Sequence, residues 1–233
     1  MNFLSHFYFD RNTDDPQRVL GMVLPDLLKN ARKEWNIRPE KQVQQYGDAE
    51  LQNIFIGWER HIAVDKHFHC SAFFLTHTQH IRTVIAPLLS SSPARPFFVA
   101  HIALELILDS LLLSEKSLDT SIFYTHLKNI DKNSLLRFFE INQLSDSSIF
   151  FSFLEEFIEA RYLNTYSNPQ EIVYALNRIC MRIWDQPFND TQKLQLTSVL
   201  INYQEKLKDD FMLIFDEIEA RLIDNPAREA STS

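Results

Sequence analysis

Apolar positions along the chain gather into helix-length segments that polar connectors separate. The segment over residues 16–30 starts with Asp14, Asp15 and Pro16, an acidic cap followed by proline in the first turn. We expect a helix there, kinked at Pro25, after a short apolar opening at residues 2–9. A basic, polar connector over residues 29–41 follows it.

The same organisation continues to the end of the chain. One long helical segment covers residues 48–74, and the residues from there to about Pro87 either continue it or begin another helix. A serine- and proline-containing loop over residues 90–96 separates them from the next helical segment, 97–113. Further helices are predicted at residues 119–130, 133–142, 147–163, 169–185 and 190–223. The simplest account is one all-α domain over residues 1–224, followed by a loose tail at 225–233.

The segment over residues 97–113 is apolar nearly all round, which predicts a buried helix. It also carries His101, Glu105, Asp109 and Ser110. A membrane span is therefore not expected, because a bilayer core makes such side chains costly.

Composition narrows the class of protein. Glycine occurs only 3 times, which disfavours the many tight turns of a β-protein. The net charge of −8 disfavours binding to nucleic acid. The opening MNFLSHFYFDR lacks the basic and long apolar regions of a signal peptide, and Cys70 and Cys180 form no CxxC pattern. We expect a cytoplasmic protein with two reduced thiols.

Two segments carry matching ladders of imidazoles and carboxylates. His61, Asp65 and His69 are spaced four apart in one segment, and the other repeats that spacing with His101, Glu105 and Asp109. Residues four apart lie on one face of a helix. If the two stripes face each other, they supply nitrogen and oxygen ligands that suit Mn, Fe, Zn or Mg.

A second interpretation of each ladder stays open. A narrow stripe of His, Glu and Asp is equally typical of the solvent-exposed face of an amphipathic helix. Asp26 is a lone carboxylate among apolar residues, which suits either a third ligand or a surface position. His6, in the apolar opening, is read as a core histidine.

Four short motifs follow one another over about the first 115 residues. An MNFLAH-like opening is present as Met1 to His6. A G-x4-D-[FL]-[VL]-[KR] segment and a G-x3-H-R-x-I-D-x3-D segment follow, and a D-x3-D-H-x-L segment comes last. The residues in register with these three segments are Gly21, Asp26, Leu27, Leu28 and Lys29; Gly57, His61, Val64 and Asp65; and Glu105, Asp109 and Leu112. In order and spacing these motifs resemble those of the bacterial acyl carrier protein phosphodiesterases.

The resemblance implies a rearranged HD-type, metal-dependent phosphohydrolase fold. It implies hydrolysis of the phosphodiester that links 4′-phosphopantetheine to a serine of holo-acyl carrier protein, with a divalent metal, typically Mn²⁺ and otherwise Fe or Zn. A bound ion would polarise the phosphoryl oxygen and lower the pKa of an attacking water. Metal or water-activating residues would be Asp26, His61, Asp65 and Asp109. Glu105 would be a further metal ligand and, with Asp65 and Asp109, a catalytic residue.

The chain departs from the family pattern at four positions. His69 replaces the last Asp of the His-Arg motif, Ile62 replaces its Arg, Glu105 replaces an Asp, and Ser110 replaces the His of the Asp-His doublet. His69 and His101 could supply replacement ligands. The alternative is a non-catalytic helical binding protein that kept the fold and lost both the metal and the activity.

A basic cluster follows Asp26 directly. Lys29, Arg32 and Lys33 begin it, and Arg38 and Lys41 complete it. Acyl carrier proteins are strongly acidic, so these side chains would suit their docking beside the proposed site. A solvated connector is the other interpretation, and the sequence leaves the oligomeric state open.

Overall fold

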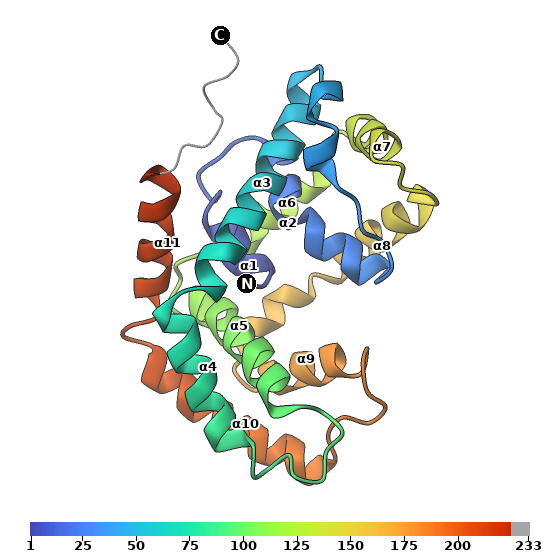
Figure 1. Ribbon diagram of the computed structural model, residues 1–233. Helices are drawn as coiled ribbons and strands as arrows, with labels where there is room; N and C mark the ends of the chain where they lie inside the picture. The colour runs from blue at the N-terminus through green and yellow to red at the C-terminus, as the bar shows by residue number, and fades with distance from the viewer. Residues whose placement is uncertain (225–233) are drawn as a thin grey trace. The chain divides into compact units, whose positions relative to one another are not determined.

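The computed structural model describes residues 1–224, and within them the chain forms α-helices and short 3-10 turns without a strand. The predicted all-α fold is therefore confirmed (Figure 1). The helices of the first half are α1 (Phe3–Tyr8), α2 (Pro16–Ala31), α3 (Ala49–His69), α4 (Ala72–Ile85) and α5 (Pro96–Ser114). Those of the second half are α6 (Thr120–Lys128), α7 (Lys132–Ile141), α8 (Ser147–Ala160), α9 (Glu171–Cys180), α10 (Asp190–Leu207) and α11 (Met212–Asp224).

Several helices are shorter than the sequence pattern predicts. The segment over residues 48–74 breaks after His69, because the Ser71 hydroxyl accepts a hydrogen bond from the Phe74 amide and starts a new helix. The segment over 190–223 divides into α10 and α11, with the buried Phe211 in the connection. A 3-10 turn, Tyr162–Ser167, ends the segment that begins with α8.

Contacts between Cα atoms divide the described chain into two compact units. Unit 1 contains Met1, Lys66–Ser117 and residues 165–224, and unit 2 contains Asn2–Asp65 and Leu118–Asn164. The prediction of a single domain stays a prediction. The predicted tail at residues 225–233 lies outside the described residues.

In unit 2, α2 packs against α1, α6 and α8. Helix α3 crosses α2 at a pair of glycines, Gly21 and Gly57. A Cβ atom at Gly57 would collide with the carbonyl oxygen of Arg18 and would lie 2.6 Å from the amide nitrogen of Met22. The two helices therefore touch backbone to backbone, and only glycine permits so close an approach.

In unit 1, α5 is the central helix and packs against α4, α9 and α10 (Figure 1). It is long and apolar enough to cross a membrane by length and composition, but 67% of its apolar window is buried inside the protein. Burial of that extent is what the apolar pattern of residues 97–113 predicts for a core helix. Helix α5 therefore presents Glu105 and Asp109 to the protein interior.

Candidate metal centre

The three polar residues of the ladder on α3 divide between two side-chain groups. His61 and Asp65 join His6 of α1 within unit 2. His69 joins His101 and Glu105 of α5 within unit 1. In each group two histidines and one carboxylate offer ligand atoms within 4.8 Å of one another.

The unit 1 group brings three ligand atoms almost into contact. The Nε2 atoms of His69 and His101 are 3.1 Å apart. The Oε1 atom of Glu105 lies 2.9 Å from Nε2 of His101 and 3.4 Å from Nε2 of His69. Ligands bound to one ion at roughly 2.0–2.2 Å stand roughly 2.8–3.6 Å apart, from the octahedral to the tetrahedral angle. The observed separations fit one divalent ion.

The surroundings of this group also suit a cation. Burial raises the pKa of Glu105, but the Met1 amino group and hydrogen bonds from His101 and His69 outweigh it and hold that pKa well below its usual range. The carboxylate is thus ionised at neutral pH. The side chains of His69 and His101 keep 31% and 35% of their surface exposed, so the group is open to solvent on one side.

Aromatic rings hold the two imidazoles in place. The Phe74 ring lies 4.9 Å from the ring of His69 and 4.9 Å from that of His101, edge-on to both. Phe68 packs against His69 and Phe74 in the same way. Phe74 lies in the first turn of α4, where its amide donates to the capping Ser71 hydroxyl.

The unit 2 group has a different geometry. Nδ1 of His61 donates a hydrogen bond to the carbonyl oxygen of Met22 at 2.8 Å. A carbonyl oxygen can only accept, so the proton sits on Nδ1 and Nε2 presents a lone pair. Nε2 of His6 lies 3.3 Å from Oδ1 of Asp65, and Nε2 of His61 lies 3.8 Å from Oδ2.

The two imidazoles of the unit 2 group stack on each other, which limits metal binding. Their centroids are 3.8 Å apart and their planes differ by 15°. A metal ion lies close to the plane of each imidazole that binds it, and two nearly parallel planes at this spacing share no such position. His61 is held by Met22, so His6 would have to turn before both rings could bind one ion. The unit 1 group needs no such movement.

Burial sets the charges of the unit 2 group. It lowers the pKa of His61 well below its usual value, and the neighbouring His6 adds to this effect. Burial alone would raise the pKa of Asp65, but the hydrogen bond and charge of His6 help to hold it far below its usual range. The group therefore combines a neutral His61 with an ionised Asp65.

The remaining predicted ligands lie outside both groups. Asp26 is half-buried on α2, one turn after Met22, and Asp109 is fully buried on α5, one turn after Glu105. Among the described residues, neither belongs to a cluster of three ligand-type side chains. Their metal-binding role stays a prediction.

The three basic residues proposed for partner docking are exposed at the end of α2. Arg32 pairs with Asp146 at 3.1 Å, and Lys29 donates to the carbonyl oxygen of Lys33 at 3.2 Å. These contacts neither require nor prevent a partner, so the docking role stays a prediction.

Sequence reasoning assigned His6 to the core and missed its place beside His61 and Asp65. His6 is fully buried, as expected, but it contacts both of these residues. Its helix, α1, is only six residues long and offers no polar stripe. The one signal was its position at the end of the MNFLSH motif.

No family model matches this chain, and neither a curated protein nor a solved structure matches it. The resemblance to acyl carrier protein phosphodiesterases stays a prediction based on four short motifs.

Proposed function

We propose that this protein is a divalent-metal-dependent hydrolase of phosphodiesters, with the ion held by His69, His101 and Glu105. The observation that carries the proposal is the set of separations of 2.9, 3.1 and 3.4 Å among their three ligand atoms. Two imidazoles and one carboxylate are a ligand set that leaves coordination positions open for water and substrate.

The chemistry follows from the charges around the group. A bound ion would supply a Lewis acid for the phosphoryl oxygen and an acidified water. Glu105 contributes a buried negative charge that offsets part of the ion's charge, and the half-exposed imidazoles leave one side open to substrate. Phe68 and Phe74 keep the two rings oriented before binding.

The resemblance names the substrate and two further residues. Holo-acyl carrier protein is the proposed substrate and partner, Mn²⁺ is the proposed ion, and Lys29, Arg32 and Lys33 are the proposed docking residues. Asp65 and Asp109 are proposed catalytic residues by the same resemblance. The low pKa of Asp65 makes its carboxylate a weak base, so we assign it to orienting His6 rather than to accepting a proton.

The test is metal content together with hydrolysis. Protein prepared without a His-tag and supplied with Mn²⁺ should hold about one equivalent of metal and cleave bis-p-nitrophenyl phosphate or holo-acyl carrier protein. His101→Ala and Glu105→Gln should lose both properties. His80→Ala, which changes an exposed histidine outside the two groups, is the matched control and should keep both. Wild-type protein that stays metal-free after reloading would refute the proposal.

A second function is favoured by one specific contact. Ser110, which stands where the family has a histidine, is fully buried and accepts a hydrogen bond from Gln204 of α10 at 3.1 Å. Ile62, which replaces the family's arginine, is 51% exposed. Of the family's two polar positions, one is thus a buried packing position in this chain and the other is an apolar surface position. This suits a helical binding protein without catalysis. Such a protein would bind its partner equally well after His101→Ala.

A further inference from the structure

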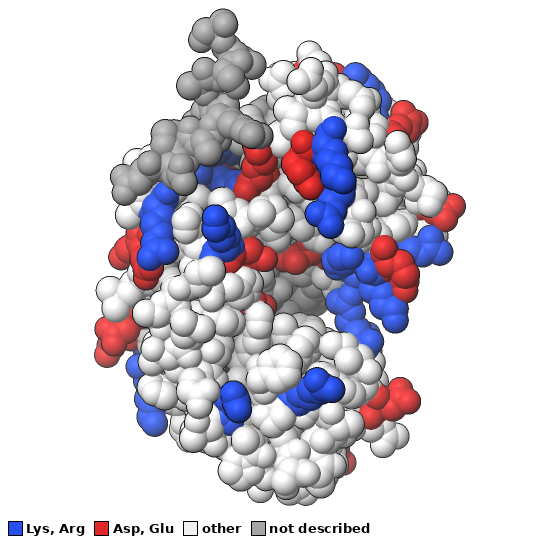
Figure 2. All heavy atoms as spheres, in the orientation of Figure 1, with Lys and Arg blue, Asp and Glu red and all other residues white. Residues whose placement is uncertain are grey.

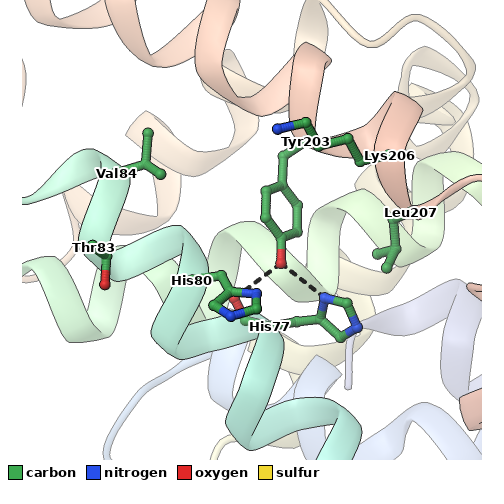
Figure 3. A pocket seen from close by; sticks show the side chains of 7 residues that line it. All are labelled: His77, His80, Thr83, Val84, Tyr203, Lys206 and Leu207. Carbon is green, nitrogen blue, oxygen red and sulfur yellow. Dashed lines mark hydrogen bonds between the residues drawn. The ribbon is translucent and has the colours of Figure 1, made fainter.

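A second candidate site lies between α4 and α10, within unit 1, and its lining is mainly apolar with a few polar groups. It is a cavity of about 410 Å³, which is the size of sites that take small organic ligands. Figure 3 shows its lining, with side chains from both helices. The lining residues are His77, His80, Thr83, Val84, Tyr203, Lys206 and Leu207.

One hydrogen-bonded pair joins the two helices at this cavity. The Tyr203 hydroxyl of α10 points at His77 of α4, and its oxygen lies 2.8 Å from Nδ1 of that imidazole (Figure 3). The same hydroxyl donates to the carbonyl oxygen of His77 at 3.4 Å. The Phe73 ring, with its centroid 4.2 Å from that of His77, packs against the imidazole. The cavity therefore has a fixed polar group at its centre.

The protonation of this pair is set by burial. Burial raises the pKa of Tyr203 to about 12, so its hydroxyl keeps its proton. Burial lowers the pKa of His77, and the charge of His80 lowers it further, while Asp210 acts in the opposite direction. At neutral pH the pair is thus uncharged and offers hydrogen bonds rather than charge.

The ionisable side chains that line the cavity include a lysine and two histidines, and Asp210, which acts on His77, is not among the lining residues. No carboxylate lines it, and residues 66–104 contain no Asp or Glu although the chain has 31 of them. Within residues 1–224 no ion pair involves Lys206 and no hydrogen bond involves His80. The part of α4 visible in Figure 2 accordingly shows no red side chain.

We propose that this cavity binds a small organic phosphate, with its anionic head on Lys206 and His80 and its apolar body against Val84 and Leu207. The ammonium and the imidazole are the donors that phosphate oxygens accept from. The Tyr203 ring and the two aliphatic side chains supply the apolar wall. The site is separate from the three metal-type ligands His69, His101 and Glu105, and it does not depend on the proposed function.

The experiment compares three probes on the intact protein by calorimetric titration. Phenyl phosphate carries both the anionic head and the apolar body, whereas inorganic phosphate and phenol each carry one of them. Phenyl phosphate should bind at one site more tightly than either. Equal binding of phenol would overturn the anionic part of the proposal, and equal binding of inorganic phosphate would overturn the apolar part.

Variants locate the site. Lys206→Gln should weaken phenyl phosphate binding about tenfold, as expected for one lost charge-assisted hydrogen bond. Lys193→Gln, on the same helix but paired with Asp190, is the matched control and should change binding less than about twofold. Unchanged binding in Lys206→Gln would overturn the proposal. Loss of binding in His101→Ala would also overturn it, because the probe would then occupy the metal-type group.

Discussion

At the scale of single residues, the hydrogen bond from His61 to the Met22 carbonyl has the largest effect on the unit 2 group. It fixes the tautomer of a side chain that is only 3% exposed, and it keeps the Nε2 lone pair on the side of Asp65. A buried histidine held neutral in this way makes the stability of the fold depend on pH.

His61 should make the protein less stable in acid. Its pKa in the folded state is below that of the unfolded chain, so the unfolded state takes up more protons once the pH falls below about 6.5. Stability is therefore full above that pH and falls below it by up to about 1.4 kcal/mol per pH unit for this residue. His61→Asn keeps an N–H donor without the titration and should lessen the fall between pH 7 and pH 5.5 in urea unfolding.

The two cysteines should differ sharply in reactivity. Cys70 is exposed, whereas Cys180 is buried and its pKa is raised to about 12 by that burial. The thiolate is the reactive form, so an aromatic disulfide reagent should label one thiol fast in the native protein and the second only on unfolding. Cys70→Ser should abolish the fast phase. A fast phase that remains in this variant would contradict the assignment.

At the scale of elements, the crossing of α2 and α3 positions the unit 2 group. Gly57 lies one turn before His61 on α3, and Gly21 directly precedes Met22 on α2. Because the backbones touch at the two glycines, the His61 ring reaches the Met22 carbonyl across the interface. The same glycines belong to two of the motifs of the resemblance, and the close contact of the two helix backbones explains why glycine is needed at both positions.

A methyl group at this crossing should be costly. Gly57→Ala would place its Cβ against backbone atoms of Arg18 and Met22, which cannot move aside without separating the helices. We expect a loss of about 1–3 kcal/mol of unfolding free energy, as for overpacking in a core. Gly47→Ala is the matched control, since nothing lies within 4 Å of its Cβ position and its φ is not positive. It should change stability by less than about 1 kcal/mol.

At the scale of the whole molecule, the metal-type group of unit 1 should couple ion binding to stability. Its ligands come from α3 and α5, which are far apart in the sequence and come together only in the folded chain. An ion that binds the folded state alone stabilises it by about 2.7 kcal/mol at a concentration one hundred times its Kd.

Thermal unfolding should report this coupling. Mn²⁺ should raise the Tm of the wild-type protein by several degrees, and the rise should disappear in His101→Ala. His80→Ala should keep the full rise. A Tm shift of equal size in His101→Ala would mean that the ion acts elsewhere on the protein.

The sequence by itself determined the helical class, the burial of α5 and the two polar stripes. Scarce glycine, helix-length apolar segments and caps are local properties, so they can be read without the tertiary structure. Spacing of four residues likewise places His61, Asp65 and His69 on one face of α3 wherever that helix packs.

Only the tertiary structure decided which of these residues meet. The spacing of polar residues identifies the polar face of a helix but not the element that packs against it. The division of the α3 ladder between His6 and His101 therefore depends on how α1 and α5 pack. The contact of Tyr203 with His77 likewise depends on residues that are distant in sequence. The break at Ser71 depends on a helix cap that competes with the continuation of α3. Ligand geometry at 3 Å is a property of packed side chains, and no spacing along the chain specifies it.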